Sequence, residues 1–81
     1  MGQKPRSRPQ HLAIKLLAIR SKLGVSQTQM ARLLKCQESY KRISEYERGR
    51  REPNLPMLLS YARLATVTVE SLIDDTFDLS L

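Results

Sequence analysis

Apolar residues recur at helical spacing along most of the chain, beginning at about residue 10. The first stripe repeats at steps of four, three and four residues and consists of Leu12, Leu16, Ile19 and Leu23. This spacing is typical of one face of an α-helix. Gly24 predicts where the helix ends, because glycine readily takes the left-handed conformation of a C-terminal cap. Lys15 and Lys22 are expected on the outer side of this helix.

A capping box opens the second predicted helix, in the run Ser26-Gln27-Thr28-Gln29. The serine hydroxyl can accept a hydrogen bond from the backbone N–H three residues on, and the side chain of Gln29 can reach back. The helix is expected to run to about Lys35, with three apolar side chains inward: Met30, Leu33 and Leu34. Gln27 lies in the first turn, where its side chain and the free backbone N–H groups point outward and can bind an anion such as phosphate.

A third helix is predicted between Ser39, which suits an N-cap, and Gly49, which suits a C-terminal stop. Its inner face carries Ile43, Tyr46 and Glu47. Its outer face and flanks are polar or charged and carry Lys41, Arg42, Ser44, Glu45 and Arg48. Two arginines and a proline follow Gly49. A short helix with this outer edge and a basic exit fits a DNA major groove, but the same pattern fits an ordinary solvated surface helix.

Two further helices follow, so the sequence predicts an all-α fold. Asn54 is expected to cap the fourth helix, whose inner stripe is Leu58, Tyr61, Ala62 and Ala65. Thr68 is expected to cap a short fifth helix, whose inner residues are Val69, Leu72 and Ile73. The chain then becomes acidic with alternate apolar residues. Residues 75–81 are expected to be a loose acidic tail or a segment that docks on a partner or a second copy.

Length and charge limit the function classes. The 81 residues suffice for one small domain. The net charge is +6, and all 14 basic residues except Arg63 precede Glu52, whereas five of the eight acidic residues lie from Glu52 onward. The cationic front of the chain can therefore hold a polyanion. Residues 1–9 predict a flexible basic arm, which can follow a phosphate backbone or enter a minor groove, or else touches nothing.

Other features point to an intracellular protein. The single cysteine, Cys36, cannot form an internal disulfide and is expected to tuck inward as a small hydrophobic residue. No apolar run is long enough for a membrane span, and the basic arm does not read as a signal peptide. A cytoplasmic location is therefore expected. No metal-ligand cluster, no paired carboxylates with a pocket and no glycine-rich phosphate loop are recognisable, so we expect no enzyme activity, no metal and no cofactor.

The order of these motifs resembles the Cro/lambda-repressor-like helix-turn-helix family, also called the xenobiotic-response-element family. The resemblance covers about residues 10–74 and is carried by Leu16-Leu17-Ala18-Ile19-Arg20, Leu23-Gly24-Val25-Ser26-Gln27, Met30-Ala31, residues 43–53 and Leu72-Ile73. It implies a compact five-helix domain with the second helix across the DNA backbone and the third in the major groove. It also implies that Gln27 anchors the second helix on phosphate, and that Arg20 and Glu47 form an ion pair between the first and third helices.

The chain departs from the family pattern in one place. About two extra residues stand somewhere within residues 35–40, before the predicted recognition helix. The family also favours glycine where this chain has Lys35 and Thr66.

The expected contacts fall into two classes. The candidates for base edges are Lys41, Arg42, Ser44 and Glu45, since lysine and arginine can donate to guanine and glutamate can accept from cytosine. The candidates for phosphate are Gln27, Tyr40, Arg48, Arg50 and Arg51. These assignments predict sequence-specific binding of double-stranded DNA by a transcriptional regulator of the repressor type, as in a prokaryote or phage.

Two points about partners stay open at this level. A homodimer through the C-terminal region would let two domains read two half-sites, and the expected contact residues are Leu72, Ile73, Phe77 and Leu79. The competing function is a protein-binding module, such as an antitoxin or a coactivator, which Glu45 on the outer face and the acidic tail favour. The arginines after Gly49 and Gln27 at the start of the second helix favour DNA.

Overall fold

Five α-helices form the part of the chain that the computed structural model describes, which is residues 9–35 and 39–79. They are α1 (Leu12–Leu23), α2 (Gln27–Leu33), α3 (Tyr40–Glu47), α4 (Leu55–Ala65) and α5 (Val69–Ile73). No strand occurs within these residues, so the predicted all-α, five-helix fold is confirmed. None of the described helices is long and apolar enough to cross a membrane.

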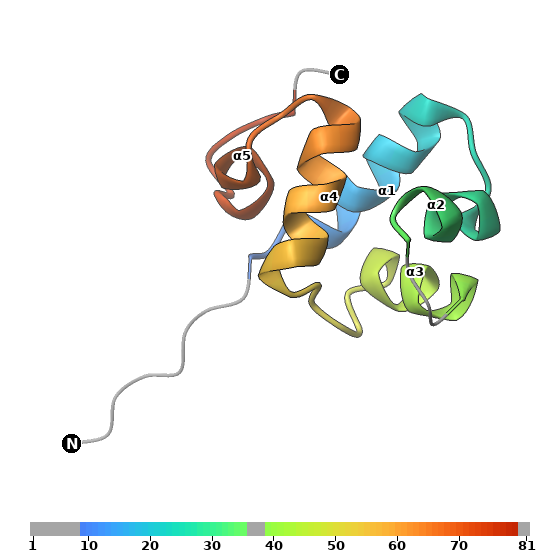
Figure 1. Ribbon diagram of the computed structural model, residues 1–81. Helices are drawn as coiled ribbons and strands as arrows, with labels where there is room; N and C mark the ends of the chain where they lie inside the picture. The colour runs from blue at the N-terminus through green and yellow to red at the C-terminus, as the bar shows by residue number, and fades with distance from the viewer. Residues whose placement is uncertain (1–8, 36–38, 80–81) are drawn as a thin grey trace.

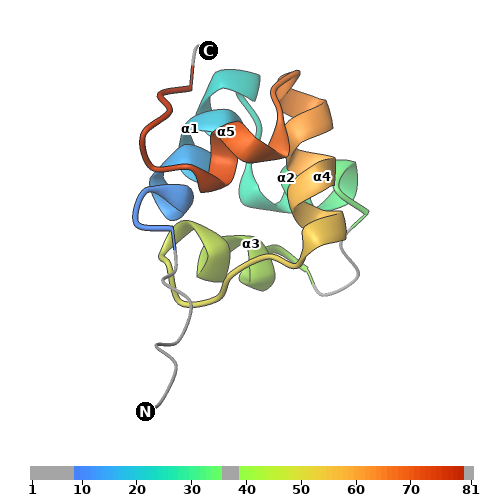
Figure 2. The ribbon, with the colours of Figure 1, turned by 90° about the vertical axis from the view of Figure 1, so that its left-hand side faces the viewer.

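α1 is the central helix of the fold. It packs against α3, α4 and α5, while α2 packs on α3 and α5 packs on α4. Figures 1 and 2 show α3 at the lower end of the molecule and α5 higher up, beside α1 and α4. This arrangement leaves α3 at one extremity of the domain.

The helix boundaries follow from local capping. Ser26 Oγ accepts from the backbone N–H of Gln29 at 3.0 Å, and Gln29 Oε1 accepts from the backbone N–H of Ser26 at 2.8 Å. This reciprocal pair is the predicted capping box of α2. Three further predicted N-caps are present, in which the side chain accepts from a backbone N–H inside the next helix: Ser39, Asn54 and Thr68. Gly24 ends α1 with a φ of 70°.

The core joins all five helices. The largest of the fully buried side chains come from all five helices: Leu16, Ile19, Met30, Ile43, Tyr61 and Leu72. The rings of Tyr46 and Tyr61 meet edge to face with their centroids 6.5 Å apart, an arrangement that aromatic quadrupoles favour. Ile43 and Tyr46 therefore attach α3 to the core by its inner face, as predicted.

Three apolar residues predicted to be inside are partly exposed. The exposed fractions are 37% for Leu23, 49% for Leu33 and 41% for Ile73. Leu23 and Ile73 are the last residues of α1 and α5, so the helices stop before a neighbour covers them. In α2 the buried face consists of Met30 and Ala31, continued by Leu34 after the helix, which places Leu33 at its edge.

Lys15 also differs from the prediction, which placed it outside. It is only 7% exposed, because α5 packs across α1 at this point. Its ammonium group donates to the backbone carbonyls of Ser71 and Asp74, each at 2.8 Å. These bonds satisfy the charged group, which would otherwise be costly to bury.

Lys35 and Thr66 take the left-handed conformation, although neither is a glycine. The family resemblance favours glycine at both positions. The φ angles are 54° for Lys35 and 57° for Thr66. This conformation is unfavourable for residues with a Cβ atom, and more so for a β-branched residue such as threonine. The prediction that Cys36 tucks inward falls outside the described residues, as do Gln37 and Glu38 of the connector with the extra residues.

Candidate nucleic-acid interface

A buried polar node fixes α3 relative to α1 and α2. Arg20 Nε lies 2.7 Å from Glu47 Oε2, and Arg20 Nη2 donates to Glu47 Oε1 at 3.1 Å. The Glu47 side chain is 5% exposed and that of Arg20 is 20% exposed. The hydrogen bond with Glu47 raises the pKa of Arg20 above its ordinary value. The pair expected between the first and third helices is thus present, as a two-pronged contact that defines orientation as well as distance.

Gln27 completes this node. Its Nε2 atom donates to Glu47 Oε1 at 3.1 Å, so the side chain turns toward α3 instead of pointing fully outward. Arg20 Nη1 also donates to the backbone carbonyl of Val25 at 3.0 Å, in the turn between α1 and α2. The pair of Arg20 and Glu47 therefore ties the turn, the start of α2 and the end of α3 together.

The outer face of α3 is polar and accessible. Tyr40 and Lys41 are exposed, and Tyr40 retains 47% of its accessible surface. Ser44 and Glu45 are half-buried, and the Glu45 side chain is 42% exposed. Arg42 is more covered than its place on the flank suggested, with 19% of its side chain exposed. The four base-edge candidates thus lie outside the apolar core, which takes Ile43 and Tyr46 from this helix.

Glu45 links the outer face of α3 to the basic loop that follows it. Its Oε1 atom lies 3.5 Å from Arg42 Nε and 3.3 Å from Arg51 Nε. Its backbone carbonyl accepts from the N–H groups of Arg50 at 2.9 Å and of Arg51 at 3.4 Å. Gly49, with a φ of 73°, turns the chain back so that these contacts form. No signal in the sequence predicted the contact between Arg51 and Glu45.

The phosphate candidates after α3 are all exposed to solvent: Arg48, Arg50 and Arg51. The loop that carries Arg51 also borders the start of the described chain. Pro9 and Gln10 line a shallow depression of about 250 Å³ together with Gly49, Arg51 and Pro53. Figure 2 shows this α3–α4 connection at the same lower end of the molecule as α3. The described chain thus begins beside the arginine loop, and the predicted basic arm, apart from Pro9, lies outside the described residues.

A model of the family described as "Helix-turn-helix" matches residues 16–72. The chain belongs to the helix-turn-helix family. A search of curated proteins gives no match. Among solved structures, the domain is similar to the P22 c2 repressor, which was solved in complex with synthetic operator 9T in the presence of Tl⁺. The two are 25% identical with a TM-score of 0.71, and the alignment covers 79% of this chain and 94% of the repressor chain. The protein is therefore a lambda-repressor-like helix-turn-helix domain.

The expected contact residues of a homodimer are not all available on the surface of this helix-turn-helix domain. Leu72 is fully buried in the core, and Leu79 is half-buried and packs against it. Leu72 was wrongly assigned, because α5 turns that residue toward α1 and α4 and leaves Ile73 outside. Ile73 and Phe77 are 41% and 46% exposed.

Within the described residues, no group of three or more potential metal ligands occurs.

Proposed function

We propose that this protein binds double-stranded DNA in a sequence-specific manner and regulates transcription as a repressor-like protein, with α3 in the major groove. The observation that carries the proposal is the node of Arg20, Glu47 and Gln27. It holds α3 by its inner side and leaves its polar side and the following arginines outward. The likeness to a repressor that was solved in complex with a synthetic operator supports DNA as the partner. The activity is binding and involves no covalent step.

The contacts divide according to position on this surface. Lys41, Arg42, Ser44 and Glu45 face base edges, and Arg42 and Glu45 act as a pair in which the carboxylate orients the guanidinium. The phosphate contacts come from Tyr40, Arg48, Arg50 and Arg51, with the backbone N–H groups at the start of α2 beside Gln27. Phosphate contacts supply most of the affinity without sequence information, whereas the base-edge residues supply the discrimination.

A second copy of the chain gives a longer recognition site. Leu55, which is 71% exposed, lines a groove of about 420 Å³ with Pro53, Leu58 and Ile73. This groove begins at the end of the arginine loop and includes Ile73, an exposed residue of the expected C-terminal dimer contact. Two half-sites one helical turn apart, about 34 Å, are the spacing expected of such a dimer. Light scattering on an Ile73→Lys variant tests it, and an unchanged mass beside a dimeric parent would exclude this surface.

Selection from a randomised duplex pool tests DNA recognition and half-site spacing in one experiment. The expected result is one enriched motif, repeated with two-fold symmetry in longer sites. Binding to every duplex alike, or to none, would contradict sequence-specific recognition. Capture of an acidic protein instead of DNA would favour the protein-binding alternative. Because the proposed partner is DNA, we place the site of action in the cytoplasm.

A further inference from the structure

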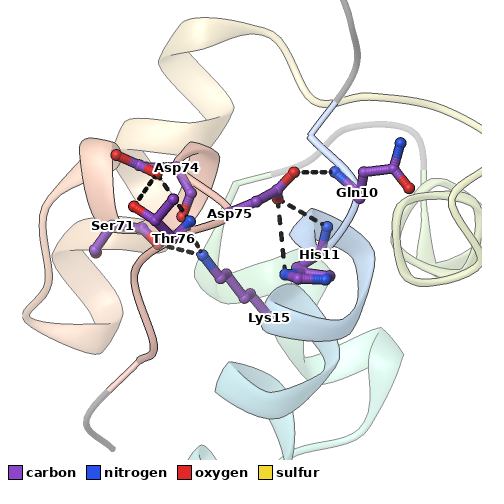
Figure 3. A network of polar contacts seen from close by, with 7 residues as sticks. All are labelled: Gln10, His11, Lys15, Ser71, Asp74, Asp75 and Thr76. Atoms are coloured by element: carbon purple, nitrogen blue, oxygen red, sulfur yellow. Dashed lines mark hydrogen bonds and ion pairs between the residues drawn. The ribbon is translucent and has the colours of Figure 1, made fainter.

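The segment after α5 holds the chain immediately before α1 (Figure 3). Asp75 Oδ2 accepts from the backbone N–H of Gln10 at 2.9 Å, and Asp75 Oδ1 accepts from the backbone N–H of His11 at 3.0 Å. α1 has no side-chain cap from His11, its own N-cap residue. One carboxylate from the other end of the sequence therefore fixes two successive residues at the entry to α1.

The position of Asp75 is itself set by its neighbours. Lys15, buried in α1, donates to the carbonyls of Ser71 and Asp74, which fixes the end of α5 against α1. Thr76 donates to Asp74 Oδ1 from its backbone N–H at 2.9 Å and from its hydroxyl at 2.6 Å. Asp75 stands between these two fixed residues, and Figure 3 shows its carboxylate turned toward Gln10 and His11. The contact is thus built into the packing of α5 on α1.

Asp75 holds Gln10 and His11, which directly follow the predicted basic arm of residues 1–9 in the sequence. Pro9 and Gln10 border the same depression as Gly49 and Arg51, in the loop that we assign to phosphate. The eight residues before Pro9 contain three basic residues and no acidic residue: Lys4, Arg6 and Arg8. A tether that starts at a fixed point gives its charged groups a high effective concentration near that point. Fixing the exit beside the arginine loop therefore favours contacts of these cations with the same phosphate backbone.

We propose that Asp75 is a positioning residue for DNA binding, because its hold on Gln10 and His11 directs the basic arm to the phosphates beside the arginine loop. The inference rests on the proposed DNA binding and adds a role for the acidic C-terminal segment. Asp75 does not touch DNA and acts only through the arm. Any event that displaces this segment, such as a partner that binds it, will weaken the arm's contribution without altering α3.

A cycle of four chains tests the proposal: the parent, Asp75→Ala, a chain lacking residues 2–8, and the two changes combined. The dissociation constant for a fluorescein-labelled random duplex is measured by anisotropy at several salt concentrations. Deleting the arm should lower the slope of log Kobs against log salt by up to about 3, since each lost phosphate contact removes roughly 0.9. Asp75→Ala in the full chain should raise Kd at least about threefold and lower the slope by roughly 1. In the chain that lacks residues 2–8, Asp75→Ala should change Kd less than about twofold. That difference between the two backgrounds would show that Asp75 and the arm are coupled.

Asp78→Ala is the matched control, because it removes the same charge from an exposed residue of the same segment whose carboxylate makes no hydrogen bond within the described residues. It should leave Kd unchanged or slightly lower. An equal loss from Asp75→Ala with and without the arm would overturn the proposal and leave Asp75 a purely structural residue, as would no loss in the full chain. If Asp75→Ala lowers the folded fraction seen by circular dichroism, Asp75→Asn, which keeps one acceptor oxygen, replaces it in the cycle. A parent chain that binds no duplex would overturn the proposed function and this inference together.

Discussion

Arg20 and Glu47 are 27 positions apart in the sequence, yet Arg20 Nε lies 2.7 Å from Glu47 Oε2 between α1 and α3. Gln27 donates to the same carboxylate from α2. One nearly buried negative charge thus connects three helices that also share the apolar core. A paired charge of this kind contributes to geometry more than to net stability, but it becomes costly once a partner is removed.

Removing the cation should therefore destabilise the fold. Arg20→Met is expected to lower the free energy of unfolding by about 3 kcal/mol or more, because Glu47 remains buried without its main partner. Urea denaturation measures this value. Lys22→Met, at an exposed position on the same helix, should change it by less than about 0.5 kcal/mol. A loss of equal size in both variants would show that the pair has no special role.

Two substitutions should separate phosphate contacts from base contacts. Arg50→Ala should weaken specific and random duplexes alike and lower the salt slope by about 0.9. Lys41→Ala should weaken the selected duplex by about 1–3 kcal/mol at one base position and leave random duplexes nearly unchanged. Anisotropy titrations with both duplexes measure these effects. The surface is wrongly placed if neither variant differs from the parent.

Glu45 is expected to increase specificity at the expense of affinity. Glu45→Gln removes the carboxylate that lies near Arg42 and Arg51, so the attraction that holds both guanidinium groups beside this side chain is weakened. Affinity for random duplex should rise several-fold, on the order of one added charge contact, while the ratio of specific to random affinity falls. Glu70→Gln, an equal change of charge on α5, is the control and should move both affinities little. A fall in random-duplex affinity for Glu45→Gln would contradict this role.

The left-handed residue at the end of α4 predicts a stabilising substitution. Thr66 has a φ of 57° and an exposed side chain, in a position where glycine has no steric penalty. Thr66→Gly should raise the free energy of unfolding by about 1 kcal/mol. Thermal unfolding measures the gain. Thr28→Gly, inside α2, is the contrasting change and should lower stability by roughly the same amount.

Stability should fall in acid through the segment that holds α1. Hydrogen bonds from Thr76 lower the pKa of Asp74, and those from the N–H groups of Gln10 and His11 lower the pKa of Asp75. Charges near Asp75 come from His11 and Lys15. In the unfolded chain the two carboxylates bind protons at a higher pH, with a pKa of about 3.9. Their contribution to the free energy of unfolding is therefore complete above that pH and is lost as the pH falls through the lowered pKa of the folded state.

Thermal midpoints measured from about pH 6 down to about pH 2.5 check this dependence. Asp75→Ala should flatten it, because one of the two titrating groups is absent, whereas Asp78→Ala should leave its shape as in the parent. A parent profile with no decrease across this range would contradict the contribution of both carboxylates.

Much of the local structure was predictable because short-range signals determine it. The capping box at Ser26, the N-caps at Asn54 and Thr68 and the stop at Gly24 act within a few residues of the helix ends that they define. Stripe residues near the middle of a helix, such as Leu16 and Ile43, were also placed correctly. Residues at helix ends, such as Leu23, were not, since their burial depends on how far the neighbouring helix extends.

The sequence alone determined the order of five helices and, on the third, a charged outer edge followed by a basic exit, because periodicity, capping and charge are local properties of the chain. Only the tertiary structure decided that Lys15 is buried under α5, that Arg51 reaches back to Glu45, and that Asp75 holds the entry to α1. Each of these contacts depends on how the chain turns or how the helices cross. The hydrophobic pattern of a single helix does not specify how that helix crosses its neighbours. Several side chains on the same face could each contact another helix, and only the crossing decides which of them does.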